Sequence, residues 1–422
     1  MLCLPNEILL LILEHLYHIN ENFRRFGNIS DLLSCRVVCK KFANVGGHLA
    51  FSHIDFMHKE DGYRKLLAIS YSSQTNNVRY LTCSFEEFDS ERVSRDNFDT
   101  YIKRHAGEDS FKTICPRKLD EAYKEHCHGH LRNSFLEQTN LDVAVLAVVL
   151  PRLGNLRSIR ITQSPKSLPS LGRCGMYYKD FRRLLQLSTG PRVFSSITTS
   201  LYATNVELTG LVLRSHDVAG LNLPLTGIVR TLSSTRSPIH EHALKALEFL
   251  SIDLTSYEKK EVSNYDGLLN LIQYAPRLEK LEISLGCGED SLLPLNFLER
   301  VSIPKLRIIR FEGADFHDPS NLMNFYSKHS ATLKRMELCD VALRRGSWER
   351  VFSHIRKTPV HSSGMDRDLC VSDKFNNVEI SSEGVLYSDL DLSPHVMNNL
   401  IESPSDRLRA KLSSYLVHSR SS

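Results

Sequence analysis

Short hydrophobic stretches with one common spacing recur along most of the chain. Their pattern is Leu-x-x-Leu-x-Leu, with other apolar residues at some positions. Copies stand at Val78-Leu81-Cys83, Leu156-Ile159-Ile161, Leu208-Leu211-Leu213, Leu247-Leu250-Ile252, Leu278-Leu281-Ile283, Leu306-Ile309-Phe311 and Leu333-Met336-Leu338. Because side chains of a strand alternate between its two faces, the last two apolar positions of each copy fall on one face. Each copy therefore predicts a short strand with one buried face.

The segments between these copies predict helices. Residues 267–275 carry a helical apolar pattern, Asp318 and Pro319 suit the N-cap and first positions of a helix, and another helix is expected after Gly346. Residues 141–161 show the same order of helix, proline and strand. Since strands joined through helices run in the same direction, we expect an α/β fold with a parallel sheet.

The spacing of the copies resembles that of leucine-rich repeats. The last four copies begin at Leu247, Leu278, Leu306 and Leu333, which are 31, 28 and 27 residues apart, close to the family's period of about 20–29 residues. The earlier intervals are irregular. The turn position that usually holds Asn or Cys instead holds Glu86, Ser164, His216, Thr255, Gly286, Ala314 and Val341. The resemblance implies an irregular leucine-rich-repeat-like solenoid, with a parallel sheet and outer helices.

Residues that alternate with the buried positions would line the open face of this sheet. A solenoid presents such a face as an extended binding surface, on which aromatic and arginine side chains are the usual anchors. The candidate substrate-binding residues are Tyr80, Arg160, Phe249, Lys280, Glu282, Ile308, Arg310, Arg335 and Glu337. If neighbouring copies are in register, Glu282, Arg310 and Glu337 alternate in sign across the strands. The alternative is an ordinary solvated face whose charges satisfy one another.

The N-terminal region carries more apolar residues than a single buried helical face needs. The stretch LPNEILLLILEHL, from Leu4 to Leu16, predicts a helix with Pro5 in its first turn. A second helical pattern, ISDLLSCRVVCKKF, follows with Ser30 as a plausible N-cap. Two short helices cannot bury this much apolar surface against each other, because so small a unit removes too little surface from water. The excess predicts a partner.

These two stretches resemble an F-box, the motif whose helices dock on the Skp adaptor of cullin-RING ubiquitin ligases. The most specific matches are the Leu-Pro-x-Glu-Ile start at Leu4 and the Val-Cys-Lys-Lys-Phe segment that ends at Phe42. Two features depart from the family: the connector from Tyr17 to Asn28 is longer than usual, and Phe42 stands where many members have Trp. The resemblance implies an adaptor-binding face made or supported by Leu4, Pro5, Ile8, Leu9, Ile12, Leu32, Leu33, Cys35, Val37 and Val38.

The order of these regions is similar to that of fungal F-box proteins with degenerate repeats. It implies an F-box helical domain over residues 1–57, a repeat region over 65–400 with loops near 85–116 and 358–377, and a tail over 401–422. The implied function is the substrate-recognition subunit of an SCF-type (Skp-cullin-F-box) ubiquitin ligase, with a cullin scaffold reached through the adaptor and an unknown protein substrate. The alternative is a non-catalytic repeat protein that binds partners without directing ubiquitin transfer.

Composition and charge narrow the remaining classes. The chain has 422 residues, and its 53 basic and 49 acidic residues give a net charge of +4, too even to imply a nucleic-acid partner. Its 10 cysteines show no regular spacing, which favours a reducing cytoplasmic or nuclear compartment. The apolar run from Val143 to Leu150 is far shorter than the roughly 20 residues of a membrane span. No membrane partner is expected.

One segment carries residues that can bind metal. The stretch CPRKLDEAYKEHCHGH contains Cys115, His126, Cys127, His128 and His130. No paired C-x-x-C accompanies them, and the pattern favours an amphipathic helix over a zinc site. Phosphate-loop, nucleophile-elbow, zincin and dinucleotide-binding motifs are also missing from the sequence. We therefore expect neither a cofactor nor catalysis in this chain.

Overall fold

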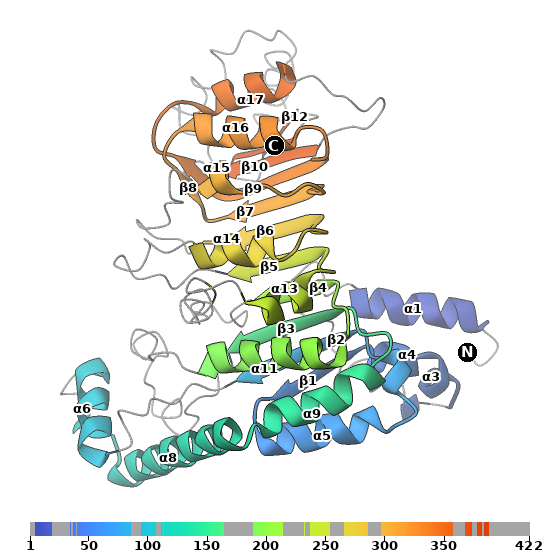
Figure 1. The fold of residues 1–422 in the computed structure, drawn as a ribbon, viewed down its shortest axis with the longest axis vertical. Coiled ribbons are helices and arrows are strands. Elements are labelled where there is room, and N and C mark those ends of the chain that lie inside the picture. The colour runs from blue at the N-terminus through green and yellow to red at the C-terminus, as the bar shows by residue number, and fades with distance from the viewer. Residues whose placement is uncertain are drawn as a thin grey trace, which may run out of the picture. The chain divides into compact units, whose positions relative to one another are not determined.

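Strands and helices alternate along most of the protein (Figure 1). The computed structural model describes residues 5–18, 34, 37–38, 40–85, 94–106, 111–112, 114–163, 189–213, 232, 237–253, 266–285, 297–357, 368–373, 378–381 and 384–387. The chain forms two compact units, unit 1 (Met1–Leu247) and unit 2 (Glu248–Ser422). Within the described residues, no helix is long and apolar enough to cross a membrane.

Unit 1 is built on four neighbouring parallel strands. These are β1 (His53–Met57), β2 (Tyr80–Phe85), β3 (Ser158–Gln163) and β4 (Gly210–Leu213). One buried row crosses all four in register, from Ile54 through Leu81 and Ile159 to Leu211. The strands therefore share one apolar face, which the helices cover.

The helices of unit 1 lie before, between and after its strands in the sequence. They are α1 (Asn6–His18), α3 (Lys40–Val45), α4 (Gly47–Ala50), α5 (Glu60–Ser70), α6 (Arg95–Ala106), α8 (Pro116–Thr139), α9 (Leu141–Val149), α11 (Thr189–Thr204) and α13 (Pro238–Leu244). Short 3₁₀ turns lie at Thr75–Asn77 and Leu150–Arg152. Helix α5 packs on β1 and on α9, and α11 packs on α9, α13, β2 and β3.

Unit 2 continues the same strand and helix alternation. Its parallel strands are β5 (Phe249–Asp253), β6 (Lys280–Ser284), β7 (Ile308–Glu312), β9 (Arg335–Leu343) and β10 (Asp368–Asp373), in that order. The short β8 (Asp315–Phe316) also pairs with β9, while β11 (Val378–Ser381) and β12 (Gly384–Tyr387) add antiparallel strands beside β10.

The helices of unit 2 are α14 (Asp266–Gln273), α15 (Phe297–Arg300), α16 (Pro319–His329) and α17 (Trp348–Lys357). The start of α16 is as the sequence predicts, because the Asp318 carboxylate accepts a hydrogen bond from the Ser320 backbone N–H at 2.7 Å and Pro319 occupies the first helical position. Capping fixes where this helix begins, and therefore where the chain leaves β8.

The predicted strand pattern is confirmed. All three apolar positions of every Leu-x-x-Leu-x-Leu copy are buried, and the strands that they occupy pair in parallel within each unit. The predicted register is confirmed as well, since Glu282 pairs with Arg310 and Arg310 pairs with Glu337. The coarse α/β prediction therefore holds.

The predicted loop over residues 85–116 is wrong in part. Phe85 ends β2, and α6 lies within the range. The few apolar residues of this polar stretch are spaced as on one helical face: Phe98 and Ile102, one turn apart, are both buried. Phe98 packs against Tyr123 and His126 of α8, with ring centroids 5.5 Å apart in both pairs. Phe98 anchors α6 because residues of α8 pack against its ring.

Two other predicted boundaries also change. The helical domain was expected to reach residue 57, but His53–Met57 form β1 and pair with β2. The loop expected over residues 358–377 contains β10 at Asp368–Asp373, whereas 358–367 and 374–377 lie outside the described residues. The predicted tail over 401–422 also lies outside them.

Candidate partner-binding surfaces

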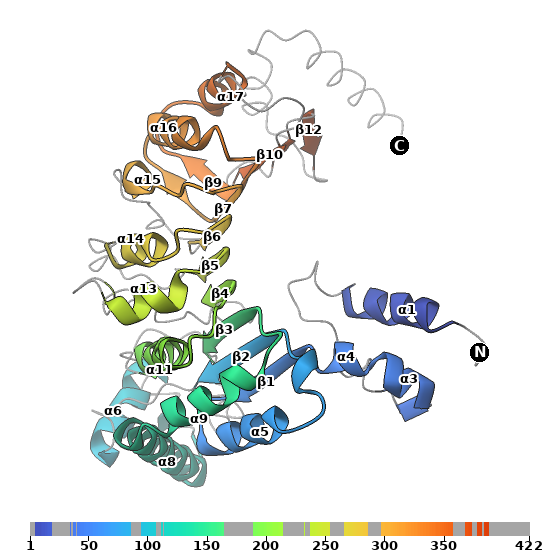
Figure 2. The same ribbon diagram turned by 45° about the vertical axis from the view of Figure 1, so that its right-hand side comes forward.

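Helix α1 has one side that packs on its own chain. Leu9 is 2% exposed and Leu13, one turn later, is 0% exposed. Leu13 forms a small core with Ala50 of α4, and Phe42 and Leu49 pack against that core. Figure 2 shows α1 with the two short helices α3 and α4, which it contacts. This core holds α1 to the rest of unit 1.

The opposite side of α1 is apolar and exposed. Ile8 and Ile12 lie one turn apart and are 42% and 43% exposed, and Leu11 is 60% exposed. Val37 and Val38, which are helical, are also exposed. Large apolar side chains gathered on one side of a helix typically mark an interaction surface. We call Ile8, Leu11 and Ile12 the apolar stripe of α1.

The residues that the F-box resemblance assigned to adaptor binding differ in their exposure. Pro5, Ile8, Ile12, Val37 and Val38 are exposed. Leu9 is buried in its own chain, so it supports the helix from beneath and offers no surface to a partner. Leu4, Leu32, Leu33 and Cys35 lie outside the described residues. Sequence reasoning missed Leu11 as a surface residue, because six consecutive aliphatic residues reveal no preferred side.

The open face of unit 1 contains a polar cluster around His53. Its Nε2 lies 2.6 Å from the Thr82 hydroxyl and 3.1 Å from the Asp55 carboxylate. Partial burial raises the pKa of Asp55, but hydrogen bonds from His53 and Thr82 and the charges of His53 and Arg160 outweigh this effect and lower it. A nucleophile relay needs the carboxylate and the hydroxyl on different ring nitrogens. This trio has both on Nε2 and cannot work that way.

Two predicted substrate-binding residues belong to this open face. Tyr80 stands opposite His53 in the register, and its ring meets the His53 ring edge-on with centroids 6.5 Å apart. Arg160 stands opposite Thr82 on the next strand. Tyr80 is exposed and Arg160 is half-buried. Both lie on the face that the sequence predicts.

The other seven predicted residues form two rows on the open face of unit 2. The first row runs Phe249, Lys280, Ile308, Arg335, and the second runs Ser251, Glu282, Arg310, Glu337, each residue opposite the next. Ser251 is the one member that sequence analysis did not name. The parallel register brings residues from four different strands into each row.

Charges on this face largely satisfy one another. Glu282 lies 2.9 Å from the Lys280 amine and accepts a hydrogen bond from the Ser251 hydroxyl at 3.0 Å. Glu337 lies 2.8 Å from Nε of Arg335 and accepts from Arg310 at 3.2 Å. Arg310 also lies 3.5 Å from the carboxylate of Glu312. The predicted alternation of sign therefore corresponds to an ion pair across strands between Arg310 and Glu337, whereas Lys280 with Glu282 and Arg335 with Glu337 pair along one strand.

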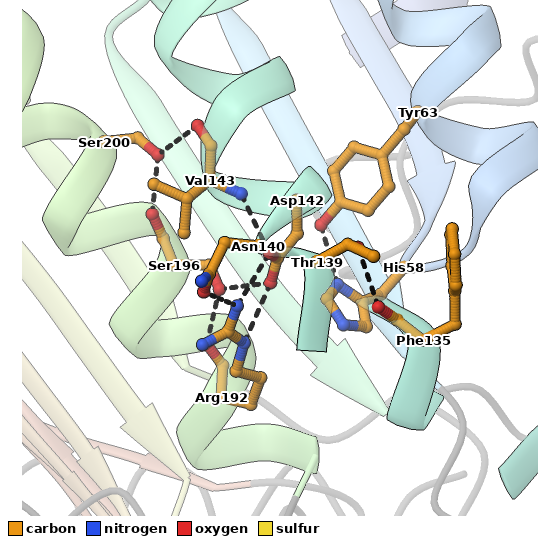
Figure 3. A network of polar contacts seen from close by, with 10 residues as sticks. All are labelled: His58, Tyr63, Phe135, Thr139, Asn140, Asp142, Val143, Arg192, Ser196 and Ser200. Atoms are coloured by element: carbon orange, nitrogen blue, oxygen red, sulfur yellow. Dashed lines mark hydrogen bonds and ion pairs between the residues drawn. The ribbon is translucent and has the colours of Figure 1, made fainter. Parts of the chain in front are cut away.

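A deeply buried polar network joins α9 to α11 (Figure 3). The Asp142 carboxylate is fully buried and accepts hydrogen bonds from Nε and Nη2 of Arg192, at 3.0 and 2.8 Å, and from the Ser196 hydroxyl at 2.5 Å. The backbone N–H of Val143 donates to the same carboxylate at 2.9 Å. Arg192 also donates to the side-chain oxygen of Asn140 at 2.9 Å. With its oxygens occupied in this way, Asp142 holds two helices together.

The histidine-rich segment forms part of α8. His126 is buried against Phe98, and His130 lies 3.5 Å from the Ser134 hydroxyl. Among the described residues, no group of three or more His, Cys, Asp or Glu side chains is arranged to hold a metal ion. The His126 ring instead takes part in the packing of α6 on α8.

Comparison with known proteins gives no family for this chain. No family model matches the sequence, and no curated protein matches it either.

Proposed function

We propose that this protein is the substrate-recognition subunit of an SCF-type ubiquitin ligase. The exposed apolar stripe of α1 is the observation that carries the proposal. Its residues Ile8 and Ile12 match positions that resemble the adaptor-contacting positions of an F-box, and Val37 and Val38 from the second F-box-like segment are exposed as well. The stripe would bind a Skp adaptor, and the open faces of the repeat-like sheet would bind a protein substrate.

Burial energetics support such a complex. Ile8, Leu11, Ile12, Val37 and Val38 would each contribute roughly 1.5–3 kcal/mol when fully covered. Five such side chains give about 10 kcal/mol, from which an association cost of at least about 4 kcal/mol is subtracted. The remainder of about 6 kcal/mol corresponds to a dissociation constant of about 40 μM, so contacts beyond these five side chains would supply the rest of the affinity of a complex that survives purification. Ubiquitin transfer would be carried out by other subunits, and this chain would supply proximity between the substrate and the ligase.

The test is adaptor binding by a variant of the stripe. We predict that Ile12→Asp abolishes co-purification of a fungal Skp adaptor, because a carboxylate cannot be buried unpaired in an apolar interface. Leu9→Asp is a poorer test than the sequence suggests, since Leu9 is buried in its own chain. Val148→Asp on α9 is the matched control, because Val148 is 42% exposed and Ile12 is 43% exposed.

Adaptor retained equally by wild type and Ile12→Asp would refute the assignment. Binding of the adaptor without recruitment of cullin, or a proteome unchanged in cells that carry Ile12→Asp, would instead favour the alternative of a repeat protein that does not direct ubiquitin transfer.

A further inference from the structure

On the open face of unit 2, the cations of the first row are more exposed than the carboxylates of the second row with which they pair. The side chains of Lys280 and Arg335 are 42% and 49% exposed, whereas those of their partners Glu282 and Glu337 are 14% and 18% exposed. A molecule that approaches the face therefore meets the positive groups first. Between the two cations lies Ile308, directly opposite both in the register.

The cations can turn outward without leaving a buried carboxylate alone. Glu282 keeps the Ser251 hydroxyl, and Glu337 keeps Arg310, when Lys280 or Arg335 moves away. Arg335 pairs with Glu337 through Nε, and its two terminal amino groups can bind a carboxylate side by side.

The spacing and the chemistry of the side chains in the first row indicate which kind of ligand can bind there. Neighbouring strands are about 4.8 Å apart, which puts Lys280 and Arg335 about 9.6 Å apart across β7. A polyproline II segment places residues i and i+3 on the same side about 9.3 Å apart. Phe249 lies at the near end, with the Lys280 amine 4.9 Å from its ring centroid, and aromatic rings are common platforms for such proline-rich segments.

We infer that this row binds an extended, proline-containing segment of a partner protein that carries carboxylates at positions i and i+3. Lys280 and Arg335 bind the two carboxylates, Ile308 packs against the backbone of the segment between them, and Phe249 stacks on a proline. The inference names the substrate class of the proposed ligase subunit and rests on that function for its biological meaning. The binding itself does not depend on it.

The probe is a fluorescein-labelled peptide, Gly-Pro-Glu-Pro-Leu-Glu-Pro-Gly, titrated with the full chain and followed by fluorescence anisotropy. Arg335→Gln is expected to weaken binding by about tenfold, because a charge-assisted bidentate contact is lost. Arg307→Gln is the matched control: its side chain is 48% exposed and pairs with Glu279 at 3.2 Å, but Arg307 precedes β7 and is not a member of the row. The control variant should bind like wild type.

Three results would overturn the inference: no binding by wild type up to about 1 mM protein, equal binding of a peptide with Gln in place of both Glu, or equal binding by Arg335→Gln. A peptide with its two Glu adjacent should bind more weakly than the probe, and equal affinity would refute the spacing. Adaptor co-purification, measured on the same variants, separates this inference from the proposed function. Probe binding without adaptor binding would refute only the ligase role, and the reverse would refute only the inference.

Discussion

His58 is a buried histidine that must remain neutral. It lies just after β1, and its Nδ1 shares a hydrogen bond of 2.7 Å with the Tyr63 hydroxyl. Burial lowers the pKa of His58 from 6.5 to about 4, with the Asp142 charge raising it and the Arg192 charge lowering it. Burial also raises the pKa of Tyr63, so its hydroxyl keeps its proton. Protonation of His58 is therefore coupled to unfolding around α5.

The first prediction concerns acid stability. Because the pKa of His58 is lower when folded than when unfolded, its full stabilising effect is present above about pH 6.5 and is lost as the pH falls toward about 4. That difference corresponds to a loss of about 3 kcal/mol. Hydrogen exchange of α5 and β1 amides should show this loss in wild type and a smaller one in His58→Gln. Identical pH profiles for the two proteins would contradict the prediction.

The second prediction concerns Gly62 on α5. A Cβ at this position would overlap the carbonyl oxygen of Met57, which ends β1. Gly62→Ala should therefore force α5 away from β1 and destabilise unit 1 by about 3 kcal/mol. The measurement is hydrogen exchange of the β1 and β2 amides. Gly154→Ala is the control, because nothing lies within 4 Å of its Cβ, and its effect should stay within about 0.5 kcal/mol.

At the scale of elements, one short turn decides where three helices meet. Asn140 adopts a left-handed conformation with φ of 49° between α8 and α9, which ends the first helix and starts the second at once. The next residue but one, Asp142, then reaches Arg192 and Ser196 on α11. The ion pair depends on this turn, because the conformation of Asn140 directs the Asp142 carboxylate toward Arg192.

The third prediction compares two ion pairs. Arg192→Ala leaves Asp142 buried without its cation and should destabilise unit 1 by about 3 kcal/mol. Arg117→Ala on α8 removes a pair of similar length, 3.1 Å to Glu121, but both partners are largely exposed, so the change should stay below about 0.5 kcal/mol. Thermal or denaturant unfolding of both variants measures the contrast. Equal losses would mean that burial does not govern these pairs.

At the scale of the whole molecule, strands were easier to predict than helix surfaces. The pattern from Leu278 to Ile283 and its equivalents fixes both the buried side and the register, since strand side chains alternate strictly. Helix α6 was missed because its polar sequence offers only Phe98 and Ile102 as anchors. The exposed side of α1 could not be predicted because its sequence has too many apolar residues, which occupy every side of the helix. The pattern of polar and apolar residues predicts which side of an element is buried only where both kinds of residue are present and segregated.

The two open faces show what the sequence could not supply. Sequence analysis placed Arg310 and Glu337 on one face, but the lower exposure of the carboxylates relative to the cations became apparent only from the structure. The polar cluster at His53 was not foreseen either, because β1 itself was missed. The exposed fraction of a side chain depends on the neighbouring side chains that cover it, and the sequence pattern does not contain that information.

If a partner covers the apolar stripe of α1, as we propose, the amount of this protein would depend on the amount of that partner. A chain that displays Ile8, Leu11 and Ile12 to water tends to stick to itself or to be held by chaperones. A partner that covers those side chains would stabilise the folded chain by mass action, and it would therefore lengthen the lifetime of the chain. Cells that make this protein in excess would accumulate unbound copies, which would be degraded. Its concentration would then follow the concentration of the partner more closely than its own rate of synthesis.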